Sequence, residues 1–252
     1  MMGRAFLWEL AGGKRPYLIL LVYFLVLLFS GTFTSDSVNV EIITPGIHIL
    51  DPITPGRLID ILWFTQNVWS FLFPVVTAYA VFAFSYELDK GILRTYLLSR
   101  IGKPKLFAIK LSVIFTGIFV PLVSGLLIAY SLADPILFAS NPFDAYVNLP
   151  LRLVLYASML YTMIGLSVLS AVAFKKPLYA FIIPVVTVYF LNNTDLGAIS
   201  SYIPPKCFPL FSTAIGLFPN FWSEMSSSVP SIIASTIALI TAFVIFTHRD
   251  VT

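Results

Sequence analysis

Residues 85–110 read SYELDKGILRTYLLSRIGKPKLFAIK and carry eight charged side chains, whereas the long apolar runs on either side carry none. In the whole chain of 252 residues only 11% are charged and 58% are hydrophobic. A soluble domain of this size has roughly 25% charged residues. We therefore expect lipid to surround most of the chain, and the charged segment to form a loop at the membrane surface.

Long apolar stretches recur along the rest of the chain. An α-helix needs about 20 such residues to cross a bilayer. Lipid offers no partners to an open strand edge, so we expect one all-α integral membrane domain over residues 1–252. The first stretch is expected to be a retained anchor rather than a cleaved signal peptide. The six expected spans have the approximate limits 16–34, 61–86, 107–132, 149–174, 178–192 and 229–247.

Lysine and arginine distribute very unevenly between the two sides of such a membrane domain. Short cytoplasmic loops carry the excess of these residues in membrane proteins. With both termini in the cytoplasm of a plasma-membrane protein, only three lie outside, namely Arg57, Arg152 and Lys206. The net charge of +3 is then a signal of topology, not of nucleic-acid binding. Twelve lie inside: Arg4, Lys14, Arg15, Lys90, Arg94, Arg100, Lys103, Lys105, Lys110, Lys175, Lys176 and Arg249.

The expected outer segments contain turn signals and one modification motif. The sequence ITPG occurs at 43–46 and again at 53–56, which predicts two tight turns in the loop 34–60. Residues 195–228 are apolar but broken by proline and glycine, so we expect one or two short re-entrant helices there. Asn192 begins a glycosylation sequon on the expected outer side.

Several kinds of chemistry lack their usual residues. The interiors of the six expected spans have no charged side chain or histidine, which disfavours a proton- or ion-driven carrier. Gly13-Lys14 and Gly102-Lys103 both lack the surrounding residues of the phosphate-binding loop GxxxxGK[ST], so this chain is not expected to hydrolyse ATP. Cys207 is the only cysteine, and we expect neither a bound metal nor another cofactor in this chain.

An intramembrane serine protease is one alternative function. Ser167 and His248 both fall near the expected cytoplasmic face and could imitate a Ser–His dyad. Span six, however, shows no small-residue face in its sequence that would bring the two side chains together. We therefore interpret Ser167 as a helix-packing residue and His248 as an interfacial one.

The charged segment has helical periodicity. At 100° per residue, Glu87, Lys90 and Arg94 share one arc, and apolar residues occupy the opposite one. This pattern predicts an amphipathic helix over about 87–100 that ends near Gly102. A plain interfacial helix, whose charges serve topology alone, has the same periodicity.

The spacing within this segment resembles a motif of the type-2 permeases of ATP-binding-cassette (ABC) exporters. The expected topology, six spans with both termini in the cytoplasm, also resembles that family. That motif runs Glu, three residues, Gly-Thr-Leu, then Leu-Leu-Ser, a Pro and an Arg, and later Gly-Lys. Ile92 and Ile109 depart from it, and so does the spacing of RIGKPK. The matching positions here are Glu87, Gly91, Leu93, Leu97, Leu98, Ser99 and Lys110.

The resemblance implies a partner and an assembly. Residues 87–100 would form a coupling helix that docks on a separate ATPase subunit carrying ATP and Mg²⁺. Residues 3–16, GRAFLWELAGGKRP, would form an amphipathic elbow helix, and two permease protomers would enclose one pathway. An apolar pathway suits an amphipathic, lipid-like or peptide substrate. The residues implied in coupling are Glu87, Gly91, Leu93, Arg94, Leu97, Leu98, Ser99 and Arg100.

The resemblance also places spans two and five at the centre of the dimer. Span two carries a polar stripe that could line the pathway or could form hydrogen bonds between helices instead. Its residues are Trp63, Gln66, Ser70 and Thr77. Besides the protease, an ATP-independent carrier or channel and a non-transporting membrane scaffold stay open as alternatives.

Overall fold

The structure is a computed structural model that describes residues 42–44, 47–49, 66–92, 101–133, 149–174, 176–194, 197 and 221–249. The expected first span and the elbow helix lie outside these residues, as do Trp63 and most of the expected re-entrant segment.

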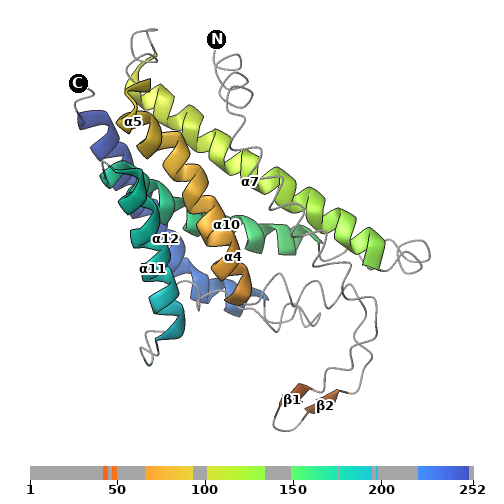
Figure 1. The fold of residues 1–252 in the computed structure, drawn as a ribbon. Coiled ribbons are helices and arrows are strands. Elements are labelled where there is room, and N and C mark those ends of the chain that lie inside the picture. The colour runs from red at the N-terminus through yellow and green to blue at the C-terminus, as the bar shows by residue number, and fades with distance from the viewer. Residues whose placement is uncertain are drawn as a thin grey trace.

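Helices make up nearly all of the described chain, and the long ones overlap the expected spans two to six (Figure 1). The apolar runs that predict the spans also set the lengths of the helices, because every backbone group within lipid needs a partner inside its own segment. The helices are α4 (Gln66–Val81), the π-helix η1 (Phe82–Tyr86), α5 (Glu87–Asp89), α7 (Lys103–Ala133), α10 (Leu149–Ala173), α11 (Pro177–Asn193) and α12 (Phe221–His248).

The described chain is not purely helical. Strands β1 (Ile42–Thr44) and β2 (Ile47–Ile49) pair in an antiparallel hairpin, in which Thr44 lies opposite Ile47. The two residues between the strands are Pro45 and Gly46, the first of the two expected turn sites. This hairpin lies in the segment that the sequence analysis assigned to an outer loop, where water can satisfy the free strand edges.

Two helices are long and apolar enough to cross a membrane, judged by length and composition over the described residues. They contain the segments Lys103–Pro121 of α7 and Ser228–His248 of α12. The apolar segments Ala157–Ala173 of α10 and Pro177–Leu191 of α11 are shorter. This composition indicates a membrane protein.

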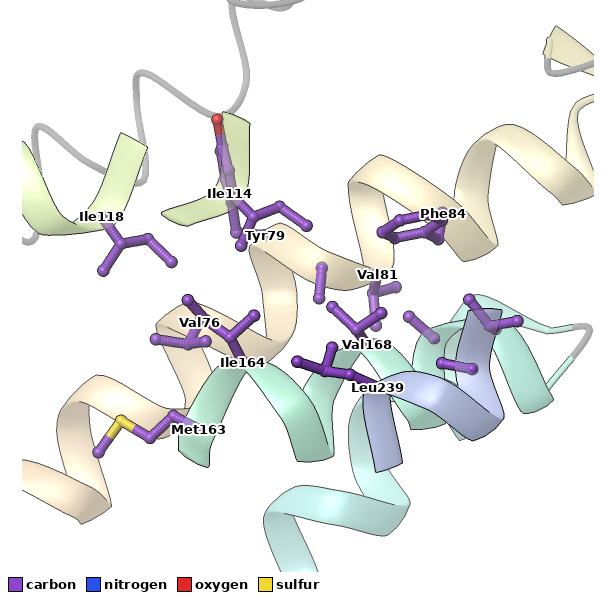
Figure 2. Packing of buried hydrophobic residues seen from close by; sticks show 14 of the residues in the cluster. Val76, Tyr79, Val81, Phe84, Ile114, Ile118, Met163, Ile164, Val168 and Leu239 are labelled. Carbon is purple, nitrogen blue, oxygen red and sulfur yellow. The ribbon is translucent and has the colours of Figure 1, made fainter. Parts of the chain in front are cut away.

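Helix α10 forms the centre of the bundle, where it contacts α4, α7, α11 and α12. Figure 2 shows Val76 of α4, Ile114 of α7, Ile164 of α10 and Leu239 of α12 in one apolar cluster. Large apolar side chains on α11 and α12 point outward instead, where lipid can solvate them. They include Tyr179, Ile183, Val186, Tyr189, Phe190, Ile233, Ile237 and Ile240.

Several helix ends meet at one end of the bundle, which we call the basic end. Here α5 ends, α7 begins and α12 ends (Figure 1), and the connection from α10 to α11 also lies here. Six of the seven lysine and arginine positions among the described residues belong to this end, the exception being Arg152 near the start of α10. The six are Lys90, Lys103, Lys105, Lys110, Lys176 and Arg249.

Candidate functional site: a buried ion pair at the basic end

An ion pair joins the end of the α4–η1–α5 helix to α7. The Lys110 ammonium Nζ donates a hydrogen bond to Glu87 Oε2 over 2.8 Å. The Lys110 side chain is completely buried, and the Glu87 side chain is 17% exposed. Lysine and glutamate are rarely buried unless they are paired. Lys110 therefore lies inside the bundle rather than in the cytoplasmic loop to which the charge pattern assigns it.

Aromatic side chains lie about one helical turn before each member of this pair. Phe84 and Phe107 lie three residues before Glu87 and Lys110, and their ring centroids are 5.4 Å apart. Phe246 of α12 lies 5.6 Å from each of these two rings. Apolar neighbours lower the local dielectric, so they strengthen the attraction within the pair and raise the cost of leaving either charge alone.

The helix that carries Glu87 ends directly after it, at a glycine. Gly91 has φ +70°, and its N–H donates to the Leu88 carbonyl over 3.2 Å. A left-handed residue after the last helical turn is the usual helix stop, and only glycine adopts it without steric cost. Ile92 is helical again. The glycine of the sequence motif therefore ends the helix that carries Glu87.

This break corrects the predicted boundary of the coupling helix. One continuous helix over 87–100 is wrong at its start, because Glu87 belongs to the end of the preceding helix and Gly91 interrupts the path. Leu93, Arg94, Leu97, Leu98, Ser99 and Arg100 lie outside the described residues.

Two more basic side chains close the ends of helices at the basic end. Lys103 Nζ donates to the carbonyls of Thr247 (3.1 Å) and Arg249 (2.9 Å), just where α12 ends. Arg249 Nη1 donates to the Val172 carbonyl over 2.6 Å, at the end of α10. The last carbonyls of a helix lack partners within it, and cations there also oppose the negative end of the helix dipole. These side chains thus bind α7, α10 and α12 to one another.

Thr77, one residue of the predicted polar stripe in span two, lies between two helices. This side chain is fully buried, and its hydroxyl lies 2.9 Å from Ser167 Oγ of α10 and donates to the Phe73 carbonyl over 2.8 Å. Thr77 therefore packs between helices, which was the alternative interpretation of the stripe. Gln66 and Ser70 lie in α4, but their side chains, like all of Trp63, fall outside the described part of the chain.

Ser167 and His248, the two residues of the protease alternative, do not form a dyad in the structure. Ser167 is buried with its hydroxyl at Thr77. His248 is exposed, and its Nδ1 lies 3.0 Å from the Val244 carbonyl within its own helix. Each polar group thus has a different neighbour, and a catalytic pair would need a hydrogen bond between the two.

The prediction that span six has no small-residue face is wrong. A Cβ atom added to Gly165 of α10 would lie 2.8 Å from the Ser235 Cβ of α12, so the two backbones approach very closely. Small side chains permit such contacts between membrane helices. The buried small residues of α12 recur every three or four positions, and they are Ser228, Ser231, Ser235, Ala238 and Ala242.

One prediction for the outer side changes at a helix end. Residues 221–228 belong to α12, which contains Pro230, rather than to a separate re-entrant helix. Asn192 lies in the last turn of α11, and the hydroxyl of Thr194 in the same sequon donates to the Phe190 carbonyl.

No cluster of three or more possible metal ligands occurs among the described residues. Comparisons with protein-family models, with curated proteins and with solved structures find no match for the chain. The arrangement itself defines a helical, apolar bundle that has the features of a membrane protein, with a buried ion pair where one charged loop begins and ends.

Proposed function

We propose that this chain is the transmembrane permease subunit of an ABC exporter. In this proposal six spans cross the plasma membrane with both termini in the cytoplasm. A separate ATPase subunit binds ATP and Mg²⁺, and two permease protomers move an amphipathic, lipid-like or peptide substrate outward.

The observation that carries the proposal is the contact between Glu87 and Lys110. These residues are the first and last positions of the sequence motif, 23 residues apart, and a motif that served topology alone would need no contact between its ends. Gly91, a third motif position, has the positive φ that a glycine supplies best. Three motif residues thus have structural reasons for their identity.

The basic end supports the orientation. Lys90, Lys105 and Lys176 are exposed there, as expected of residues that face the cytoplasm under the positive-inside rule. Ile92 and Ile101, the described residues on either side of the segment 93–100, belong to this same end. A cytoplasmic ATPase that docked on this segment would contact a loop whose two ends are fastened to each other by an ion pair.

An ATP-independent carrier or channel is the main competing function, and a scaffold is the next. Neither needs a rigid cytoplasmic loop. The competing functions are separated from an ABC exporter by whether the native complex hydrolyses MgATP and whether this hydrolysis depends on the loop.

The test is purification of the full-length chain with its native partners, followed by reconstitution into lipid vesicles and measurement of MgATP hydrolysis. One variant replaces residues 90–98 with a Gly/Ser linker of equal length, which leaves Arg100, Lys103, Lys105 and Lys110 to direct insertion. A control replaces nine residues of the expected outer loop, 50–58, in the same way.

We expect the wild-type complex and the outer-loop control to hydrolyse MgATP. The 90–98 variant should insert normally but lose its ATPase subunit, or hydrolyse ATP without transport. A native complex that contains no protein with a phosphate-binding loop would overturn the proposal. Normal transport by the 90–98 variant would instead remove the coupling role of the loop.

A further inference from the structure

The π-helix η1 (Phe82–Tyr86) lies directly before Glu87 and changes the direction in which that residue points. A π-helical turn holds about one residue more than an α-helical turn, and such turns are frequent at functional sites. Because each α-helical residue advances by about 100°, the additional residue changes the face on which every later side chain lies.

A second contact between the α4–η1–α5 helix and α7 shows the effect of this change of face. Tyr79 of α4 packs against Gly117 of α7, where an added Cβ would lie 3.0 Å from the Tyr79 hydroxyl. Seven residues separate Lys110 from Gly117 along α7, whereas eight separate Tyr79 from Glu87 along the facing helix. Two antiparallel α-helices with contacts at both points would need equal spacings. The facing helix therefore has one residue in excess.

The angles lead to the same result. Along a regular α-helix, eight residues turn about 800°, which leaves Glu87 about 80° away from the direction of Tyr79. With one residue absorbed by the π-helix the turn is about 700°, so Glu87 comes within about 20° of the face that meets α7. Phe84, which contacts Phe107 of α7, has moved onto this face as well.

We infer that η1 is a positioning element that turns Glu87 onto Lys110, so that the buried pair clamps the base of the loop between α5 and α7. Without the π-helix, Tyr86 would occupy the position facing Lys110, and the lysine would be buried opposite an aromatic side chain. Loss of one member of a buried ion pair is strongly unfavourable. The clamp fixes the two helices on either side of this segment to each other.

The register of the two helices, meaning which residue after η1 faces Lys110, is tested by removing or adding one residue within η1. Deletion of Ala83 lets the helix become regular while Glu87 keeps its direction, since the excess residue is gone. Insertion of one alanine after Ala83 turns Glu87 away by about 100° and brings Tyr86 to face Lys110. In a regular α-helix the two changes would be equally disruptive, so a difference between them is specific to the π-helix.

The measurement is a double-mutant cycle of Glu87→Gln and Lys110→Met on the unfolding equilibrium of the purified chain. Interacting pairs couple by about tenfold in an equilibrium constant. We expect this coupling in the wild type and in the deletion variant, and none in the insertion variant. Coupling that persists after the insertion, or that is lost after the deletion, would overturn the inference.

A rescue keeps the test decisive if the insertion weakens folding. Tyr86→Glu in the insertion variant places a carboxylate opposite Lys110 again and should restore both the stability and the coupling with Lys110→Met. The same substitution in the wild type should give no such coupling. Failure of the rescue in a folded insertion variant would count against the register.

The effect of these variants on transport rests on the proposed function. The register of Glu87 against Lys110 does not depend on that function. The deletion variant should couple ATP hydrolysis to transport, the insertion variant should not, and the rescue should recover it. A native complex without ATPase activity would remove the proposed function and leave the cycle to decide the register. A coupled insertion variant would contradict the clamp even in an active exporter.

Discussion

Gly165→Ala tests the close contact between α10 and α12, which is the tightest glycine contact in the described structure. The new Cβ would lie 2.8 Å from the Ser235 Cβ, 3.0 Å from its carbonyl oxygen and 3.1 Å from its Cα. Carbon atoms in contact prefer about 3.5–4.0 Å. The two helices must therefore separate by nearly 1 Å, because two of the three obstructing atoms belong to the backbone and cannot rotate away.

Three effects set the size of the change in the free energy of unfolding. Overfilling a packed interface costs about 1–3 kcal/mol. Separation of the helices also weakens the Ser235 hydrogen bond to the Thr162 carbonyl (3.3 Å) and the Tyr161–Thr236 contact (3.0 Å), at about 0.6 kcal/mol each within a membrane. Alanine is favoured over glycine in a helix by about 1 kcal/mol, which opposes these losses. We expect a net destabilisation of about 1–3 kcal/mol by these combined estimates.

The assay is unfolding of the purified chain by a denaturing detergent, with Gly102→Ala as the matched control. An added Cβ at Gly102 meets only Pro104 Cδ, at 3.9 Å, which is an ordinary contact. Gly165→Ala combined with Ser235→Gly should recover part of the loss, since the 2.8 Å contact disappears and the 3.0 Å contact stays. If Gly165→Ala proved as stable as the wild type, the close approach of α10 and α12 would be refuted.

Other side chains allow three further tests. A double-mutant cycle of Thr77→Val and Ser167→Ala should give a coupling of about 0.6 kcal/mol, up to about 1.7. Transport per complex should be unchanged. Loss of transport at full stability would instead indicate that Thr77 lines the pathway. Gly91→Ala should cost about 1–2 kcal/mol in unfolding assays because of its left-handed φ, and Gly91→Asn should cost less; equal stability of all three would contradict the helix stop. In a cysteine-free background, a membrane-impermeant thiol reagent applied to intact cells should label Asp51→Cys and not Lys175→Cys, and the reverse pattern would invert the proposed topology.

Helix positions were predictable because one physical requirement determines them. Expected limits such as 149–174 agree with α10 (Leu149–Ala173), since an apolar run in lipid must be helical throughout. The start of α12 was placed eight residues late, at 229 instead of Phe221. The sequence between these points is rich in serine, and Pro230 follows it directly. Such a stretch is typical of a helix break, although a helix can continue through it when neighbouring helices provide support.

The ion pair was not predictable from periodicity. A helical wheel assumes 100° for every residue, and under that assumption Glu87 shares an arc with Lys90 and Arg94 on an exposed helix. The break at Gly91 interrupts this arc, and the π-helix before Glu87 changes the direction of Glu87 relative to α4. The motif itself contained the only signal, because it names Glu87 and Lys110 as its two ends. The position of Thr77 was open for a different reason. A polar stripe shows which residues share a face of a helix, but not what that face contacts.

The contact between α10 and α12 also bears on the order in which the protein assembles. Of the helices that the structure describes, α12 leaves the ribosome last, yet it covers the central helix, and Ser235 of α12 donates to the Thr162 carbonyl of α10. Until α12 arrives, one side of α10 faces lipid with its glycine and hydroxyl groups uncovered. Lys103 at the start of α7 must likewise wait for the carbonyls of Thr247 and Arg249. A chain that stops short of residue 221 would therefore insert but stay an unfinished bundle, and cellular quality control could recognise it by that open side.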